Sequence, residues 1–130
     1  MALYRSLLAG LVAVVLLGAL PAAAAEWKDF DAKAFAAAQQ AGKPILVDVF
    51  AAWCPVCRAQ NPVLVKLTRD PKYNDLVVFK VDFDNEKDAL RALNVQKQST
   101  LIVFKGDKEL DRSIGDTSEF SIESMLDKTL

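Results

Sequence analysis

Two cysteines, Cys54 and Cys57, are the residues of this sequence best suited to covalent chemistry. They are the only cysteines in the chain, and two residues separate them. An apolar run typical of a buried strand, residues 45–50, precedes them, and a helical pattern over residues 57–68 follows. A helix start offers free backbone N–H groups and the positive end of the dipole, so a sulfur there can ionise near neutral pH. This pattern predicts a thiol–disulfide exchange site with a redox disulfide between the two residues.

Two other uses of such a pair are weaker. A closed zinc site takes about four Cys or His ligands, whereas this chain has two Cys and no His. Only a dimer pooling four thiolates could build one, so we expect neither a metal nor another cofactor in a single molecule. A structural disulfide would close so small a loop that it removes little chain entropy. Redox chemistry is therefore favoured.

The N-terminus, residues 1–25, has the pattern of a signal peptide. Arg5 supplies a positive charge, residues 7–20 are apolar, and Ala23–Ala25 are the small residues that a signal peptidase accepts. The apolar run falls short of the about 20 residues of a membrane span. We expect cleavage before Glu26, with retention as a membrane anchor as the alternative.

The rest of the chain, residues 26–130, is predicted to be one domain. Positive and negative side chains nearly cancel, 16 against 17, which gives no indication of a nucleic-acid partner. Export to the periplasm or a similar compartment would place the cysteines where disulfides form and persist. A domain of this size buries a core without disulfides, so the pair is free for catalysis.

Hydrophobic periodicity and turn residues predict the order of elements. Strands are expected over 27–30, 45–50, 76–83, 100–105 and 109–114, and helices over 31–41, 57–68, 86–93 and a C-terminal segment. Asp31 should cap the first helix and Gly42 should end it. Pro62 lies inside the second helix. Ser118 or Ser121 should cap the last helix, with Leu130 on its apolar face. This order predicts an α/β fold whose central mixed sheet has helices on both faces.

With these motifs in order, the chain resembles the thioredoxin family. The resemblance covers residues 26–130, and its motifs are residues 47–57 (VDVFAAWCPVC), Pro62, 80–82, 100–106 and Gly115. It implies a thioredoxin fold. Together with the signal pattern, it makes the chain most similar to periplasmic thioredoxin-like proteins. These usually exchange electrons with a membrane thiol transporter or with other exported proteins, so we expect such partners and a monomer.

Two departures from the family pattern matter. Family members carry a cis-proline where this chain has Ser99, and that proline faces the cysteines, pairs with substrate and keeps metals away. A cis bond before a non-proline residue costs about 3 kcal/mol, so we expect a trans bond or a strained loop. The second departure is Pro55-Val56 between the cysteines. Since no histidine is available to stabilise the thiolate, we expect a reductant of moderate potential.

The resemblance assigns roles to four residues. Cys54 matches the family's exposed sulfur and should be the nucleophile, and Cys57 should resolve the mixed disulfide. Asp48 interrupts an apolar strand, so burial should raise its pKa and suit it to accept the Cys57 proton; the alternative is a hydrated position at the sheet edge. Lys80 matches the lysine that pairs with this acid, and its alternative is a solvated surface lysine.

Neighbouring residues are predicted to contact substrate. These are Trp53, Pro55, Val56, Ser99 and Thr100. Trp53 could instead pack partly in the core, and the Ser99 hydroxyl could hydrogen-bond the Cys54 sulfur. The acidic stretch 82–88 lacks the glycine and the final glutamate of a calcium loop, so we interpret it as a solvated helix cap.

These observations predict a thiol–disulfide oxidoreductase of an exported compartment that reduces or interchanges disulfides of partner proteins through Cys54 and Cys57. A disulfide oxidase or isomerase is the first alternative. A dimer that binds a metal or an iron–sulfur cluster through the same cysteines is the second.

Overall fold

The computed structural model describes residues 13–19 and 24–130. The predicted signal peptide lies largely outside these residues. Residues 13–19 form neither helix nor strand, and Val14, Val15, Leu16 and Leu17 are exposed. No helix in the described part of the chain has the length and apolar content that a membrane span requires.

The domain is built on one five-stranded mixed sheet. Its order is β1-β3-β2-β4-β5, with β1, β2 and β3 parallel and β4 and β5 antiparallel to their neighbours. The strands are β1 (Glu26–Asp29), β2 (Pro44–Phe50), β3 (Val77–Asp82), β4 (Thr100–Lys105) and β5 (Lys108–Ile114). The helices are α1 (Ala32–Gln40), α2 (Pro55–Leu67), α3 (Lys87–Ala92) and α4 (Glu119–Asp127), with a short 3-10 turn at Pro71–Tyr73.

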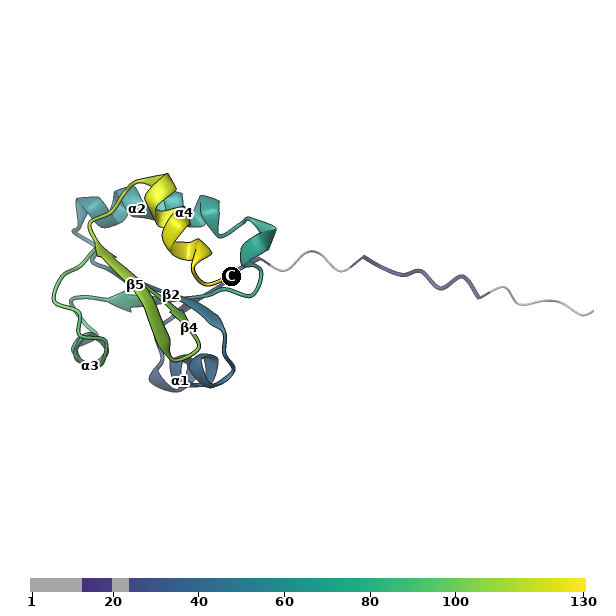
Figure 1. The fold of residues 1–130 in the computed structure, drawn as a ribbon, viewed down its shortest axis with the longest axis horizontal. Helices are drawn as coiled ribbons and strands as arrows, with labels where there is room; N and C mark the ends of the chain where they lie inside the picture. Colours follow the sequence, from purple (N-terminus) through teal and green to yellow (C-terminus); the bar gives the residue numbers. More distant parts are fainter. Residues whose placement is uncertain (1–12, 20–23) are drawn as a thin grey trace, which may run out of the picture.

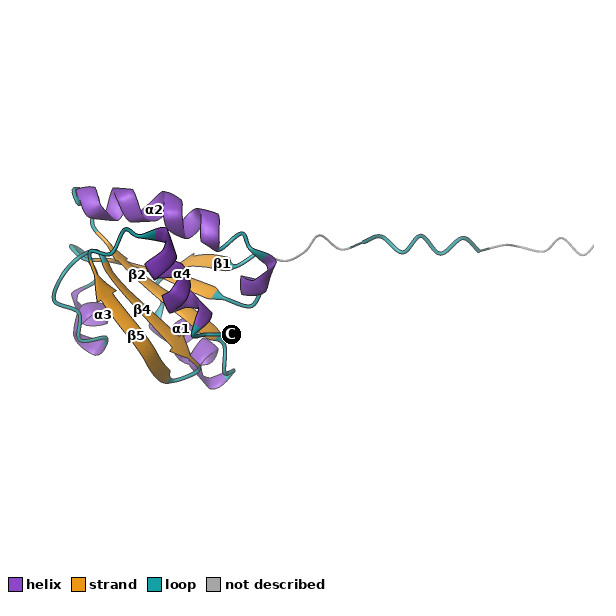
Figure 2. Ribbon diagram, turned by 45° about the horizontal axis from the view of Figure 1, so that its top comes forward, coloured by secondary structure: helices purple, strands orange, loops and turns teal. Residues whose placement is uncertain are grey.

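Helices cover both faces of the sheet, as predicted. Helices α2 and α4 lie on one face and α1 and α3 on the other (Figures 1 and 2). The side chains of β2 alternate between the two cores: Val47 packs on the α1 and α3 side, and Leu46 on the α2 and α4 side. Burial on both faces explains why β2 is apolar at nearly every position, with Asp48 as the exception. Asp48, two residues after Leu46, therefore faces α2.

Local capping chemistry sets the helix ends. Asp31 accepts a hydrogen bond from the Ala34 N–H at 2.8 Å and starts α1, and Ser118 caps α4. Helix α2 begins two residues earlier than predicted because Cys54 is its N-cap and Pro55, whose φ suits a first helical position, follows. The prediction that Leu130 lies on the apolar face of the last helix is wrong, because this helix ends at Asp127 and Leu130 is exposed.

The N-terminal end of the domain is anchored just before β1. Ala25 is buried in the core on the α2 and α4 side, and the Glu26 N–H donates to the Leu76 carbonyl at 2.9 Å. Cleavage before Glu26 stays a prediction; it would remove the buried Ala25 methyl group.

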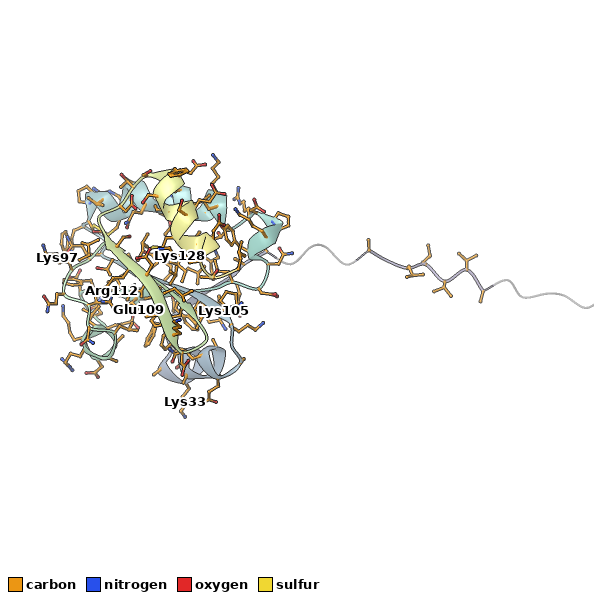
Figure 3. The ribbon with its side chains drawn as sticks, in the orientation of Figure 1. Lys33, Lys97, Lys105, Glu109, Arg112 and Lys128 are labelled. Carbon is orange, nitrogen blue, oxygen red and sulfur yellow. A yellow bond between two sulfur atoms is a disulfide. The ribbon has the colours of Figure 1, made fainter. Side chains whose placement is uncertain are left out.

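Charged side chains hold the periphery of the fold. On β5, Arg112 donates to the Leu93 carbonyl at 2.9 Å and the Asn94 carbonyl at 3.0 Å, and pairs with Glu109 (Figure 3). These bonds fasten the C-terminal end of α3 to the sheet. Lys128 joins α4 to Asp111 of β5 at 2.7 Å.

Candidate active site

The two cysteines lie at the start of α2 and form a disulfide. Their Cα atoms are 5.3 Å apart. Cys54 is the N-cap residue, and its Sγ accepts a hydrogen bond from the Cys57 N–H at 3.1 Å. This N–H and the helix dipole would stabilise a thiolate on Cys54 once the disulfide opens. The predicted position of both sulfurs at a helix start is confirmed.

The predicted exposure of the Cys54 sulfur is wrong for this oxidised state. Cys54 is 1% exposed and Cys57 is 7% exposed. Both pack with Ala51, and the partly buried rings of Phe50 and Phe83 lie against this group. A partner protein can reach the Cys54 sulfur only after neighbouring groups move.

Asp48 is buried in the interior of the sheet. Its strand, β2, has β3 on one side and β4 on the other, so the alternative of a hydrated sheet-edge position is wrong. Burial raises the pKa of its carboxyl from 3.8 to about 6, and the positive charge of Lys80 opposes this rise. A carboxyl that titrates close to neutrality can exchange protons with a thiol. Its role as the acceptor for Cys57 stays a prediction.

Lys80 lies beside Asp48 on β3 but does not form the predicted pair. The two residues are opposite each other in the register of β2 and β3. No ion pair joins them among the described residues. The Lys80 Nζ instead lies 4.4 Å from the centre of the Phe50 ring, a cation–π distance. Lys80 is half-buried, and its charge acts on Asp48 from a distance.

A cavity of about 450 Å³ joins these residues. It is lined by Asp48, Phe50, Ala51, Ala52, Cys57, Arg58, Asn61 and Lys80. The exposed residues Ala52, Arg58 and Asn61 mark its mouth. Three of the four residues predicted to be catalytic therefore share one solvent-connected space, whereas Cys54 lies outside its lining.

The loop that ends at Ser99 is joined to helix α2 through Gln60. The described residues contain no cis peptide bond, so the trans bond predicted at Ser99 is confirmed. Its φ of +57° lies in the left-handed region, which costs an L-residue about 1–2 kcal/mol. The Ser99 N–H donates to the Val49 carbonyl at 2.8 Å, and its carbonyl accepts from the Gly115 N–H at 2.9 Å.

Ser99 and Thr100 present little side-chain surface. Both are buried, and the Thr100 hydroxyl donates to the Lys97 carbonyl at 2.6 Å. No hydrogen bond within the described part of the chain joins the Ser99 hydroxyl to Cys54. The assignment of these two residues to a substrate groove stays a prediction that requires the loop to open.

Gln60 is the residue at this site that the sequence analysis missed. It is 1% exposed and lies one turn after Cys57 on the same face of α2. Its Nε2 donates to the Ser99 carbonyl at 3.2 Å and to the Asp116 carbonyl at 2.8 Å. Gln60 thereby ties two loops to the helix that carries the cysteines. The sequence did contain a signal for Gln60. It is a polar residue on the same face of α2 as the buried Leu64 and Leu67.

Trp53, Pro55 and Val56 form the outer surface beside the disulfide. All three are exposed. Trp53 is not among the side chains that pack against the core clusters of the described residues, so the alternative in which it packs partly in the core is wrong. The Trp53 indole N–H donates to the Asp84 carboxylate at 2.9 Å. Their contact with substrate stays a prediction.

The acidic stretch 82–88 forms the turn before α3 and the first residues of this helix. The Asp82 carboxylate accepts from the Asp84 N–H at 2.9 Å and from the Asn85 side chain at 2.7 Å. Within residues 13–19 and 24–130, no three His, Cys, Asp or Glu side chains are grouped as metal ligands.

Comparison with known proteins agrees with this geometry. The sequence profile of the family described as Thioredoxin matches residues 26–128. A "Thioredoxin H-type" of Brassica campestris is 38% identical over 90 residues, which cover 69% of this chain and 71% of that protein. "Thioredoxin-2" of Saccharomyces cerevisiae is 36% identical over 73 residues, covering 56% and 68%.

Solved structures show the same fold. Trxlp from Edwardsiella tarda superimposes with a TM-score of 0.76 at 44% identity, covering 78% of this chain and 98% of that chain. Oxidised thioredoxin O2 from Arabidopsis thaliana gives a TM-score of 0.68 at 27% identity, covering 80% and 94%. The chain therefore belongs to the thioredoxin family, as a disulfide oxidoreductase with its redox-capable pair at Cys54 and Cys57.

Proposed function

We propose that the protein reduces or interchanges disulfides of partner proteins in an exported compartment, as a monomer that cycles between dithiol and disulfide. The observation that carries this proposal is the Cys57 N–H, which lies 3.1 Å from the Cys54 Sγ at the start of α2. It marks Cys54 as the sulfur whose thiolate is stabilised and which attacks first.

The cycle follows from these positions. The Cys54 thiolate attacks one sulfur of a partner disulfide, and the other partner sulfur leaves as a thiolate. Asp48 accepts the proton of Cys57, either directly or through water in the cavity. The Cys57 thiolate then attacks the Cys54 Sγ, forms the disulfide seen here and releases the second partner thiol. A reduced thiol protein, such as a membrane thiol transporter, would return two electrons to the pair.

The exported location is supported by the charge and apolar pattern of residues 1–25 and by the family match, which begins at residue 26. N-terminal sequencing of the protein recovered from the exported fraction of the producing cell tests it. A mature chain that begins close to Glu26 is expected. An uncleaved chain in the cytoplasmic fraction would contradict the proposal.

Insulin reduction tests the chemistry. Cys54→Ser should lose the activity, and Cys57→Ser, its matched control, should accumulate a mixed disulfide between Cys54 and insulin. Full activity of Cys54→Ser would remove Cys54 from the mechanism.

The direction of electron flow is tested by the reduction potential. A value near the thioredoxin end, about −270 mV, is expected for a reductant, whereas a value near −120 mV would indicate an oxidase.

A metal-bridged dimer is disfavoured because four shared thiolates must reach the surface, and both cysteines are buried.

A further inference from the structure

We propose that the cavity next to Asp48 binds a small organic anion, a free carboxylate or sulfonate, between the side chains of Arg58 and Lys80. The binding itself does not depend on the proposed function. Its consequence for proton transfer does rest on that function, because it requires Asp48 as the proton acceptor.

The cavity has the space for such a ligand and opens to solvent. Its volume is about 450 Å³, within the range of small-molecule sites, about 300–1,000 Å³. Ala52, Arg58 and Asn61 are exposed residues of its lining. The side-chain amide of Asn61 can donate a hydrogen bond to an anion. A small ligand can therefore enter and find polar groups.

Two cationic side chains line the cavity, and the charged end of each lies beside another lining residue. The Arg58 guanidinium donates to the Ala52 carbonyl at 3.4 Å, and the Lys80 Nζ lies 4.4 Å from the centre of the Phe50 ring. Neither cation forms an ion pair among the described residues. Both charges are therefore available to an anion, and they act more strongly in a cavity than on an open surface.

Asp48 is the one acid among the lining residues, and its ionisation opposes anion binding. Its neighbours on the adjacent strands are Lys80 on β3 and the uncharged Leu101 on β4, and Arg58 is the other charged residue of the lining. Burial raises the pKa of the Asp48 carboxyl to about 6, and Lys80 opposes this rise. Below that pH, the two positive charges face no negative charge, so anion binding should strengthen as the pH falls.

The coupling between the anion and the Asp48 proton is reciprocal. A bound anion repels the Asp48 carboxylate and offsets the charge of Lys80, so it raises the pKa of Asp48 further. In the proposed cycle, Asp48 must be ionised to accept the proton of Cys57. An anion in the cavity would therefore slow this step and the release of the partner protein.

NMR titration of the oxidised full-length protein with sodium methanesulfonate tests the site. The amide signals of Ala52 and Asn61 should shift and saturate, whereas the neutral analogue dimethyl sulfone should cause no such shift. Arg58→Gln and Lys80→Gln should each weaken binding about fivefold or more. The control Arg69→Gln, at an exposed site outside the lining of this cavity, should bind as the wild type does. Unchanged binding in Lys80→Gln would place the anion on the outer surface and overturn the cavity site.

The pH dependence tests whether the anion lies close to Asp48. Methanesulfonate stays ionised between pH 5 and pH 8, and the wild type should bind it about fivefold more tightly at pH 5 than at pH 8. Asp48→Asn should bind it at both pH values about as tightly as the wild type does at pH 5. With saturating methanesulfonate, the ¹³C signal of the Asp48 carboxyl should titrate at a higher pH than without it. An unchanged titration of this carboxyl would overturn the proposal.

A short peptide separates a free anion from an acidic side chain of a partner protein. Acetyl-Gly-Glu-Gly-amide should bind no more tightly than methanesulfonate. Binding of the peptide about tenfold more tightly or better would assign the cavity to a partner's side chain and overturn the assignment to a free anion. Insulin reduction without methanesulfonate binding would reject this inference and leave the proposed function standing. Binding by a protein that does not reduce insulin would do the reverse.

Discussion

Two regions beside helix α2, the Ser99 loop and the cavity that contains Asp48, differ in how their polar groups are satisfied. On the Ser99 side, the loop backbone bonds to Val49, Gly115 and Gln60, and the side chains are buried. On the Asp48 side, a cavity holds a carboxyl and two cations without a direct ion pair among them. The first region is buried and closed by hydrogen bonds, and the second is charged and open to solvent at its mouth.

The two regions therefore differ in what they can do: burial limits access to the Cys54 sulfur, and the cavity allows Asp48 to exchange its proton. Cys54 is buried with Ala51, and the rings of Phe50 and Phe83 lie against this group, which limits the molecules that reach the more reactive sulfur. A buried acid next to Cys57 needs water or a mobile group to exchange its proton, and the cavity supplies the space. The following variants alter one side at a time.

Ser99→Pro should have the largest effect, on the closed side. Proline holds φ near −65°, whereas Ser99 has φ +57° and its N–H donates to the Val49 carbonyl. The variant loses that bond and cannot keep the loop conformation, so unfolding in urea should show a loss of about 3–5 kcal/mol. Ser99→Gly, which accepts a positive φ, should stay within about 1 kcal/mol of wild type. A fully stable proline variant would mean that the loop adopts a second backbone arrangement.

Asp48→Asn should have the next largest effect, on the cavity side. The folded state holds the Asp48 proton more tightly than the unfolded state, since its pKa rises from 3.8 to about 6. The wild-type free energy of unfolding therefore falls as pH increases from about 4 to about 6, by about 3 kcal/mol in total. Asn removes this loss, so the variant should gain about that amount at pH 8 and almost nothing at pH 4. Thiol release at pH 7 should slow because the proton acceptor is gone.

Urea unfolding at several pH values measures this effect. The control Asp75→Asn changes an exposed carboxylate and should shift stability by less than about 0.5 kcal/mol at every pH. An equal gain for Asp48→Asn at pH 4 and pH 8 would contradict the role of burial.

Gln60→Leu should weaken the closed side more modestly. It removes one buried and one partly buried hydrogen bond. The Asp116 carbonyl loses its donor, while the Ser99 carbonyl keeps the Gly115 N–H. We expect a loss of about 2 kcal/mol and faster hydrogen exchange at the Gly115 amide. The exposed control Gln40→Leu should change neither. Unchanged exchange in Gln60→Leu would show that the loop holds itself without the glutamine.

Trp53→Phe should have the smallest effect on stability. The ring is exposed, and only its N–H bond to Asp84 is lost, so unfolding should change by less than about 1 kcal/mol. A larger loss would mean that the bond to Asp84 orders the start of α2.

The fold and the centre of the site could be predicted because their signals are local. Apolar strands, Asp31 and Ser118 as caps, and the Cys54–Cys57 spacing each depend on neighbouring residues. Asp48 was identified because a carboxylate within an apolar strand is costly to bury. Gln60 was missed because its partners, Ser99 and Asp116, are 39 and 56 residues away along the chain.

By itself, the sequence determined the order of elements, the position of both sulfurs at a helix start and the burial of Asp48, since periodicity and capping act within a few residues. Only the tertiary structure decided that the Ser99 loop bonds to Gln60 of α2, that Lys80 lies over Phe50 instead of pairing with Asp48, and that Cys57 lines a charged cavity. These features depend on which distant side chains fill the space around the disulfide, and no short segment of the chain contains that information.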